Sequence, residues 1–68
     1  MKIKSNVKQI MEQKGFTLRK LEDATKITHV TILRARKDDT IANCHLETLR
    51  VIADALECSI KDLFTEET

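Results

Sequence analysis

The apolar residues of this chain recur at the spacing of short helices rather than of strands. The first helical face is made by Val7, Ile10 and Met11. Ser5 or Asn6 can accept hydrogen bonds from the first backbone N–H groups of such a helix, and Gly15, the one glycine, suits a left-handed position after its last turn. We therefore predict a first helix that begins after Asn6 and ends before Gly15.

A second and a third helix are predicted next, each opened by a threonine. Thr17 can cap the second helix, of about eight residues, and Phe16 stands before it at the position of a hydrophobic staple. The inward face of this helix comprises Leu18, Leu21 and Ala24 or Thr25. Thr28 can cap the third helix, which runs to about Arg36. Two short helices separated by a short break form a candidate helix-turn-helix.

The second half of the chain carries the longest amphipathic pattern. Its apolar positions at helical spacing are Leu46, Leu49, Ile52, Ala53 and Leu56. The polar segment KDDTIAN before this fourth helix predicts a loop with Ile41 tucked beneath it, and either Asn43 or His45 can cap the helix. Ser59 and Asp62 resemble a capping box that opens a short fifth helix. That helix carries Ile60, Leu63 and Phe64, and we expect the acidic tail 65–68 to fray.

The composition favours one small all-α domain. The chain has 68 residues, no proline, one glycine and only two aromatic residues. Glycine and proline are far below average usage, and the alternation typical of strands is nearly absent. We expect a single domain over 1–68, with its core at 5–64. No apolar run could span a membrane and the N-terminus lacks an apolar signal region, so we expect a cytoplasmic protein.

The net charge of +1 hides an asymmetry between the two halves of the chain. Residues 1–37 carry ten Lys or Arg and three acidic residues, whereas residues 38–68 carry two and eight. A basic half of this kind indicates a polyanionic partner, and charge that segregates by chance is the alternative. The segment KITHVTILRARK, residues 26–37, concentrates the pattern: basic and hydroxyl side chains surround Ile27, Ile32 and Ala35, and no acidic residue is present.

Other chemistries have little support in the sequence. A metal site built from Cys44, His45 and His29 would need ligands from separate segments without the usual paired spacing, so we expect no metal. A disulfide between Cys44 and Cys58 is not expected in a reducing compartment, and neither thiol has the clustered basic neighbours of a reactive cysteine. No glycine-rich phosphate loop or nucleophile with an orienting base is present, so we expect neither enzymatic activity nor a cofactor.

Taken together, these elements resemble the phage-repressor/Cro (XRE-like) helix-turn-helix DNA-binding family. The resemblance is carried by TLRKLEDATKITHVTI, residues 17–32, and by LETLRVIADALECSIKDLF, residues 46–64. It implies a compact five-helix, lambda-repressor-like domain with the helix-turn-helix at its second and third helices. It also implies a sequence-specific transcriptional regulator, acting as a repressor, that binds double-stranded DNA as a homodimer and inserts its third helix, about 28–36, into the major groove.

The resemblance further implies roles for individual residues. The candidate base-reading residues are His29, Val30, Leu33 and Arg34. The candidate phosphate-binding residues are Thr17, Arg19, Lys20, Thr28, Thr31, Arg36 and Lys37, and the candidate dimer patch is Ile60, Leu63 and Phe64. Arg34 suits the guanine O6 and N7 acceptors, and Val30 suits a thymine methyl.

Each base-reading assignment has an alternative. Val30 or Leu33 could instead lie in the core or in a dimer contact, and His29 could simply be solvated. Arg34 could be a surface arginine that pairs with Asp38 or Asp39.

Three positions depart from the usual pattern of the family. Leu18 stands where the family usually has a glutamine that bridges to a phosphate. Glu22 stands where a small residue usually packs between the two helices, and Lys26 where the turn usually has glycine. Glu22 must then either turn outward or push the helices apart. These departures favour an alternative function, a protein-interaction module such as an antitoxin or anti-regulator with the same fold.

Overall fold

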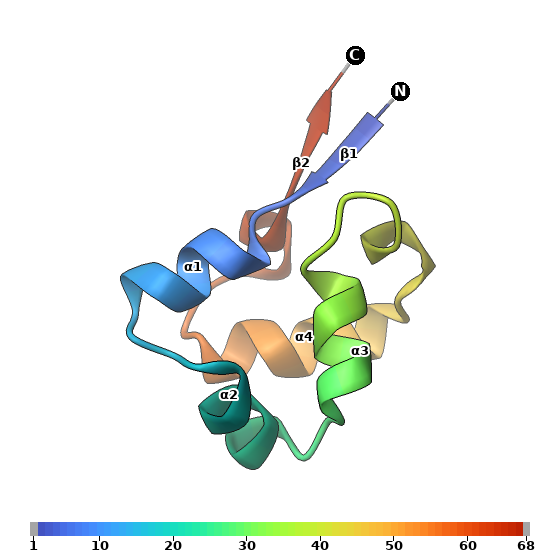
Figure 1. Cartoon of the computed structure of the whole chain (residues 1–68). Helices are drawn as coiled ribbons and strands as arrows, with labels where there is room; N and C mark the ends of the chain where they lie inside the picture. Colours follow the sequence, from blue (N-terminus) through green and yellow to red (C-terminus); the bar gives the residue numbers. More distant parts are fainter. Residues whose placement is uncertain (1, 68) are drawn as a thin grey trace.

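The computed structural model describes residues 2–67 and shows a cluster of short helices that carries a two-stranded antiparallel sheet at one end (Figure 1). The elements in chain order are β1 (Lys2–Ser5), α1 (Val7–Gln13), α2 (Leu18–Thr25), α3 (His29–Ala35), the 3₁₀ helix η1 (Ile41–Asn43), α4 (Leu46–Ala55), the 3₁₀ helix η2 (Ile60–Leu63) and β2 (Phe64–Glu67). The first four predicted helices are therefore confirmed. No helix among the described residues has the length and apolar character that a membrane crossing requires.

The prediction of five helices and no strand was wrong at the two ends of the chain. The fifth helix is the four-residue 3₁₀ helix η2, and the chain then extends into β2. Strand β1 pairs with β2 so that Lys2 lies opposite Glu67 and Ser5 opposite Phe64. Residues 65–67 of the predicted fraying tail thus belong to a sheet, whereas Thr68 lies outside the described residues. The pairing joins segments from opposite ends of the sequence, so no local sequence pattern predicts it.

Ser5, the last residue of β1, also contacts the region where α3 ends. Its backbone N–H donates to Asp38 Oδ1 at 2.8 Å, and its hydroxyl donates to the carbonyl oxygen of Ala35, the last residue of α3. The Val7 N–H in turn donates to the Ser5 hydroxyl oxygen at 3.3 Å. Ser5 therefore connects the strand pair, the start of α1 and the end of α3.

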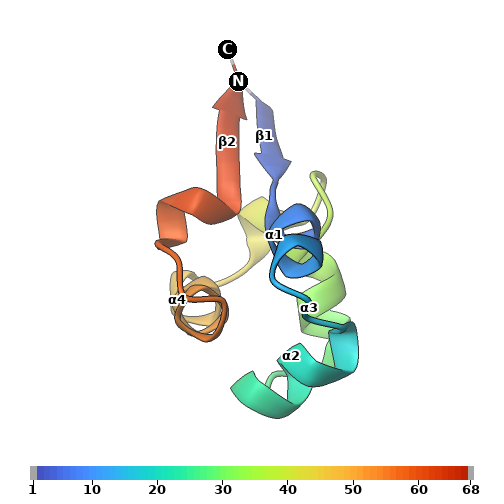
Figure 2. The ribbon, with the colours of Figure 1, turned by 90° about the vertical axis from the view of Figure 1, so that its left-hand side faces the viewer.

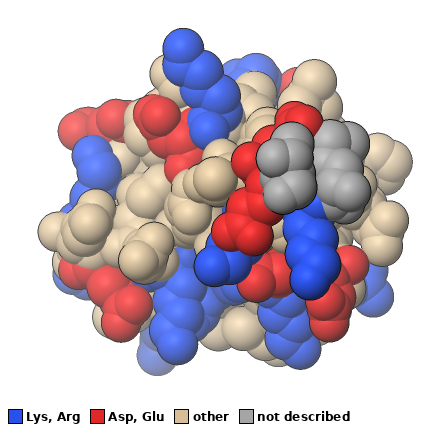
Figure 3. Space-filling model, turned by 90° about the horizontal axis from the view of Figure 1, so that it is seen from above, with Lys and Arg blue, Asp and Glu red and all other residues tan. Residues whose placement is uncertain are grey.

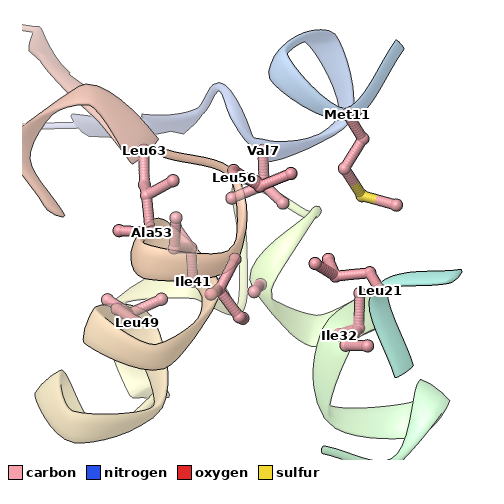
Figure 4. Close-up of a cluster of buried hydrophobic side chains, with 11 residues drawn as sticks. Val7, Met11, Leu21, Ile32, Ile41, Leu49, Ala53, Leu56 and Leu63 are labelled. Atoms are coloured by element: carbon pink, nitrogen blue, oxygen red, sulfur yellow. The ribbon is translucent and has the colours of Figure 1, made fainter. Parts of the chain in front are cut away.

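The core is formed by apolar side chains from all four α-helices and both 3₁₀ helices (Figure 4). The buried residues are Val7, Met11, Leu21, Ile32, Ala35, Ile41, Leu49, Ile52, Ala53, Leu56 and Leu63. Ile41 is 2% exposed, which confirms its predicted place beneath the loop. Of the two alternatives for the inward face of α2, Thr25 is partly buried and Ala24 is exposed. Leu46, the first residue of α4, continues the apolar pattern of that helix but is 68% exposed.

Several local signals predicted the ends of the helices correctly. Gly15 follows α1 in the left-handed region with φ of 72°, and the Phe16 N–H closes the helix end by donating to the Met11 carbonyl oxygen at 2.8 Å. At η2, the Ser59 N–H donates to Asp62 Oδ2 at 3.0 Å, as the predicted capping box requires. His45 rather than Asn43 is the N-cap residue of α4, although its side chain makes no capping hydrogen bond.

Candidate nucleic-acid interface

Helices α2 and α3 form the helix-turn-helix, and α2 lies at the end of the molecule away from the strand pair (Figures 1 and 2). Thr17 caps α2 through its hydroxyl oxygen, which accepts from the Lys20 N–H at 3.1 Å. The two helices are held by Leu21 of α2 and Ile32 of α3, which are both fully buried and lie together on one side of the core (Figure 4). The buried faces of these two short helices thus fix where their open faces point.

The turn between the two helices forms despite its lysine. Lys26 occupies the left-handed region with φ of 62°, a conformation that costs a non-glycine residue roughly 1–2 kcal/mol. Its N–H donates to the Glu22 carbonyl oxygen at 2.8 Å, which ends α2. The hydroxyl oxygen of Thr25 accepts from the Ile27 N–H at 3.2 Å and stabilises the next residue of the turn. Lys26 therefore adopts the left-handed conformation for which glycine is best suited.

Glu22 caps α3, and Thr28 does not. Thr28 holds the N-cap position, but its side chain makes no capping bond; its hydroxyl lies 3.3 Å from that of Thr31. Instead, Glu22 Oε2 accepts from the backbone N–H of His29 at 2.7 Å. A carboxylate at the start of a helix also interacts favourably with the helix dipole, by about 0.3–1 kcal/mol. Glu22 therefore turns outward from α2 and stabilises the adjacent helix, so the departure from a small residue here has a structural use.

The four candidate base-reading residues share the open face of α3. His29 and Arg34 are exposed, and Val30 and Leu33 are 49% and 37% exposed. The alternative that Val30 and Leu33 lie in the core is wrong. The residues of α3 that enter the core are Ile32 and Ala35, which have no exposed surface. Positions 29, 30, 33 and 34 fall on one side of a helix by its periodicity. The face is therefore a mixture of cationic, aromatic-ring and aliphatic groups that is open to solvent.

Arg34 has no acidic partner among residues 2–67. Asp38, one of the two carboxylates that could have paired with it, instead accepts from the Ser5 N–H, and neither Asp38 nor Asp39 forms an ion pair in this part of the chain. The backbone carbonyl oxygen of Arg34 accepts from the Thr40 hydroxyl at 2.6 Å. The backbone of Arg34 is therefore fixed by a hydrogen bond. Its guanidinium group donates no hydrogen bond to another of the described residues.

The Lys and Arg side chains of the helix-turn-helix form no ion pair within residues 2–67, so they are available for an anion. Within residues 2–67, the ion pairs with Lys or Arg are those of Lys4 with Glu67 and of Arg50 with Glu47 and Asp54. The unpaired candidates for phosphate binding are Arg19, Lys20, Arg36 and Lys37, of which Arg36 is half-buried. The three candidate threonines also reach the surface, since Thr17 and Thr28 are exposed and Thr31 is partly exposed.

The charge asymmetry of the sequence is only partly kept in space. Lys2 and Lys4 of the basic half lie in β1 opposite the acidic β2, so Lys, Arg, Asp and Glu side chains lie side by side at that end of the molecule (Figure 3). Segment 17–37 retains the excess, with six Lys or Arg and two acidic residues. The positive charge is therefore associated with α2, α3 and their flanks rather than with the whole N-terminal half.

A polar hollow beside α3 adds residues that the sequence did not indicate. It is lined by Thr31, Arg34, Thr40, Asn43, Cys44, His45 and Thr48. Its members come from α3, the following loop, η1 and the start of α4, and only folding brings them to one place. The one sequence signal that could have indicated these residues is the loop after α3, which is rich in hydroxyl and amide side chains and follows a basic helix.

The candidate dimer patch is smaller than predicted. Leu63 has no exposed area and belongs to the core, so its assignment to the patch was wrong. Ile60 and Phe64 are half-buried. Phe64 also lines an apolar groove of about 210 Å³ together with Ile3, Ile41, Ala42, Cys44, Leu46 and Leu49. Leu46 is the most exposed of the large apolar side chains in this groove.

Both cysteines carry free, partly buried thiols, and we expect them to react slowly. Burial raises the pKa of the Cys44 thiol, against the opposing effect of Arg34, and burial and then Asp62 raise that of Cys58. Because the thiolate is the nucleophile, alkylation at about pH 8 should be slower in the folded protein than in urea and should accelerate as the pH rises. Timed quenching followed by mass spectrometry would measure both rates, and folded-state alkylation as fast as in urea would contradict the expectation.

Comparison with protein families agrees with this geometry. The family model of the Cro/C1-type HTH DNA-binding domain matches residues 6–68. No curated protein and no solved structure matches the chain. The matched range begins at Asn6, the N-cap of α1, and contains α2, the turn with Lys26, α3 and α4. With a helix-turn-helix described in the structure and a match over nearly its whole length, the chain belongs to the family of Cro/C1-type helix-turn-helix DNA-binding domains.

Proposed function

We propose that this DNA-binding protein is a sequence-specific transcriptional repressor that inserts α3 into the major groove of double-stranded DNA. The observation that carries the proposal is the open face of α3. This face presents His29, Val30, Leu33 and Arg34, while Ile32 and Ala35 anchor the opposite side of the helix in the core. In helix-turn-helix proteins the second helix of the motif places such side chains at the base edges of the major groove.

Arg34 is the strongest base-reading candidate in this arrangement. Its guanidinium can donate two parallel hydrogen bonds to O6 and N7 of a guanine, and no ion pair within residues 2–67 competes for it. Val30 and Leu33 offer apolar surface to thymine methyl groups. Together these contacts would distinguish a guanine next to a short A·T-rich stretch.

Residues around the open face would position the duplex without reading its sequence. Thr17, Arg19 and Lys20 stand at the start of α2, and Arg36 and Lys37 follow the end of α3. The hydroxyl groups of Thr28 and Thr31 lie at the start of α3. Leu18 is half-buried, so the phosphate contact that the family usually makes there falls to its exposed neighbours Arg19 and Lys20.

We infer that two copies of the chain bind together to a two-fold symmetric operator. Half-sites about one helical turn apart require two α3 helices in fixed relation. Ile60 and Phe64 keep part of their surface for such a contact, and the groove lined by Phe64 and the exposed Leu46 adds further apolar area. A second copy would cover apolar surface that one copy leaves in water.

Selection of bound sequences from a random DNA library would test the function and the symmetry together. We expect a palindromic motif with a guanine at one position of each half-site. A reporter gene placed behind this motif should then be transcribed less when the protein is present. Absence of any enriched sequence, with no binding even at low salt, would overturn the proposal, and increased transcription would replace repression by activation.

Replacement of Arg34 by alanine is expected to weaken operator binding by roughly 1–3 kcal/mol, or about five- to 150-fold, and to relax the preference at one base position. The loss comes from the guanine contact. Binding titrations with the operator and with each single-base variant would measure both effects.

Arg50→Ala is the matched control for this substitution. Arg50 is exposed on α4 and is paired with Glu47 and Asp54, so its loss changes the net charge equally but removes no group from the α3 face. An equal loss of affinity for operator and random DNA in Arg34→Ala would make Arg34 a phosphate contact instead.

The alternative of a protein-interaction module has lost most of its basis. It was favoured by three departures from the family pattern, of which two are accommodated: Lys26 takes the left-handed conformation and Glu22 caps α3. The remaining departure, Leu18, changes one phosphate contact. No observation on the described surface favours a protein partner over DNA at the open face of α3.

A further inference from the structure

The geometry points to a residue that controls base recognition without touching DNA. We propose that Glu22 fixes the tautomer of His29, so that His29 Nε2 is a hydrogen-bond acceptor and selects a base with an exocyclic amino group. Glu22 is thus a positioning residue, and His29 is the group that contacts the base. This inference rests on the proposed insertion of α3 into the major groove.

One carboxylate oxygen holds both the backbone and the ring of His29. Glu22 Oε2 lies 2.7 Å from the His29 backbone nitrogen and 3.3 Å from its Nδ1. The backbone bond fixes the oxygen independently of the ring, because it also caps α3. The side chains of Glu22 and His29 are 36% and 60% exposed, so the ring keeps a free edge toward solvent.

The choice of tautomer follows from the chemistry of the two groups. An ionised carboxylate can only accept hydrogen bonds, so its partner Nδ1 must carry a hydrogen. A neutral imidazole carries one hydrogen, which leaves the lone pair of Nε2 as an acceptor. Without a partner at Nδ1 the hydrogen could reside on either nitrogen, and the ring could donate or accept.

The other charged groups near the start of α3 do not compete for the ring. Asp23 of α2 and Lys26 of the turn line the same shallow depression as Glu22, Ile27 and Thr28. Among residues 2–67, Glu22 is the one carboxylate within ion-pair distance of His29. Arg34, on the same face of α3, brings positive charge further along the helix.

An acceptor at Nε2 distinguishes bases in the major groove. Adenine presents its N6 amino group there and cytosine its N4 amino group, whereas guanine and thymine present acceptors at the corresponding positions. With its hydrogen on Nδ1, facing Glu22, His29 should therefore favour adenine or cytosine.

Glu22→Gln tests this assignment, with Asp23→Asn as the matched control. The glutamine amide keeps the size of the side chain and can still cap α3, but it can also donate, so it no longer dictates the tautomer. Asp23 is exposed on the same helix, and its neutralisation changes the charge equally without a contact to His29. Thermal unfolding of both variants beside the wild type would confirm that all three are folded.

The first measurement uses the free protein. Nitrogen NMR of the His29 imidazole at about pH 8 should report the Nδ1–H tautomer in the wild type and in Asp23→Asn, and a mixture in Glu22→Gln. A predominant Nε2–H tautomer in the wild type would overturn the inference, whether or not the protein binds DNA.

The second measurement uses DNA libraries selected at about pH 8. His29→Ala identifies the base position concerned. The wild type and Asp23→Asn should prefer adenine or cytosine there by about five-fold, and Glu22→Gln should lose that preference while it keeps the rest of the motif. DNA binding with a preference that Glu22→Gln leaves unchanged would overturn the inference alone. Absence of all sequence-specific binding would overturn the proposed function and the base selection together, and the NMR result would still stand.

Discussion

Replacement of Ile32 by alanine is expected to weaken DNA binding strongly by destabilising the domain, although Ile32 faces away from the proposed DNA surface. The side chain is fully buried and holds α3 against the rest of the core. Truncation of a buried isoleucine costs about 2–5 kcal/mol. A single core in a domain of this length supplies about 3–5 kcal/mol of net stability, so one such cavity can consume most of it.

The neighbouring residue provides the control. Leu33 is 37% exposed on the opposite face of α3, so Leu33→Ala should leave the melting temperature nearly unchanged and weaken only the binding to DNA. Thermal unfolding followed by circular dichroism, with a gel-shift titration on the same samples, would separate the two effects. An Ile32→Ala variant that melts with the wild type would show that α3 is not held in the way described.

Operator binding is expected to lose roughly 10³- to 10⁵-fold in affinity between about 50 mM and 200 mM salt. This range applies to a complex with about six to ten phosphate contacts, because each contact releases condensed counterions from the DNA. Arg19, Lys20, Arg36 and Lys37 have no ion-pair partner within residues 2–67, and two copies of the chain would double their number. Fluorescence anisotropy with labelled operator across a salt series would give the slope.

Lys37→Ala should reduce that slope by about one unit and weaken binding to all sequences alike, since a phosphate contact carries no sequence information. Lys61→Ala, an exposed lysine of η2 outside the helix-turn-helix, should leave the slope unchanged. A flat salt dependence in the wild type would argue against a phosphate-dominated interface. A loss confined to some operator variants would place Lys37 at a base edge.

The helices could be predicted from the sequence because their signals are local. Apolar spacing placed α1 to α4, Thr17 and Gly15 marked helix ends, and Ser59 with Asp62 marked η2. The strand pair could not be predicted in this way, because its two segments are short, mostly polar and at opposite ends of the sequence. Its backbone hydrogen bonds also explain why the tail is extended rather than helical.

The residues of the candidate interface were predicted one by one from the sequence. Their exposure in the structure agrees with an open face on α3, whereas the burial of Leu63 removes it from the dimer patch. Val30 and Leu33 could not be separated from core positions by spacing alone, and only the burial of Ile32 and Ala35 decided between them. Leu63 shows the reverse, since an apolar residue near a chain end proved to be interior. The role of Glu22 was hidden for a different reason: its contact with His29 depends on how two helices meet across the turn.

The contacts of Ser5 have a consequence for where this domain can be cut. The family match starts at Asn6, so a shortened chain that begins there would retain every residue proposed to touch DNA. It would nevertheless lose the strand opposite β2 and the hydroxyl group that binds the carbonyl oxygen of Ala35 at the end of α3. Strand β1, Lys2–Ser5, thus supports the C-terminal end of α3. The range matched by the family is therefore shorter than the part of the chain that holds α3 in place.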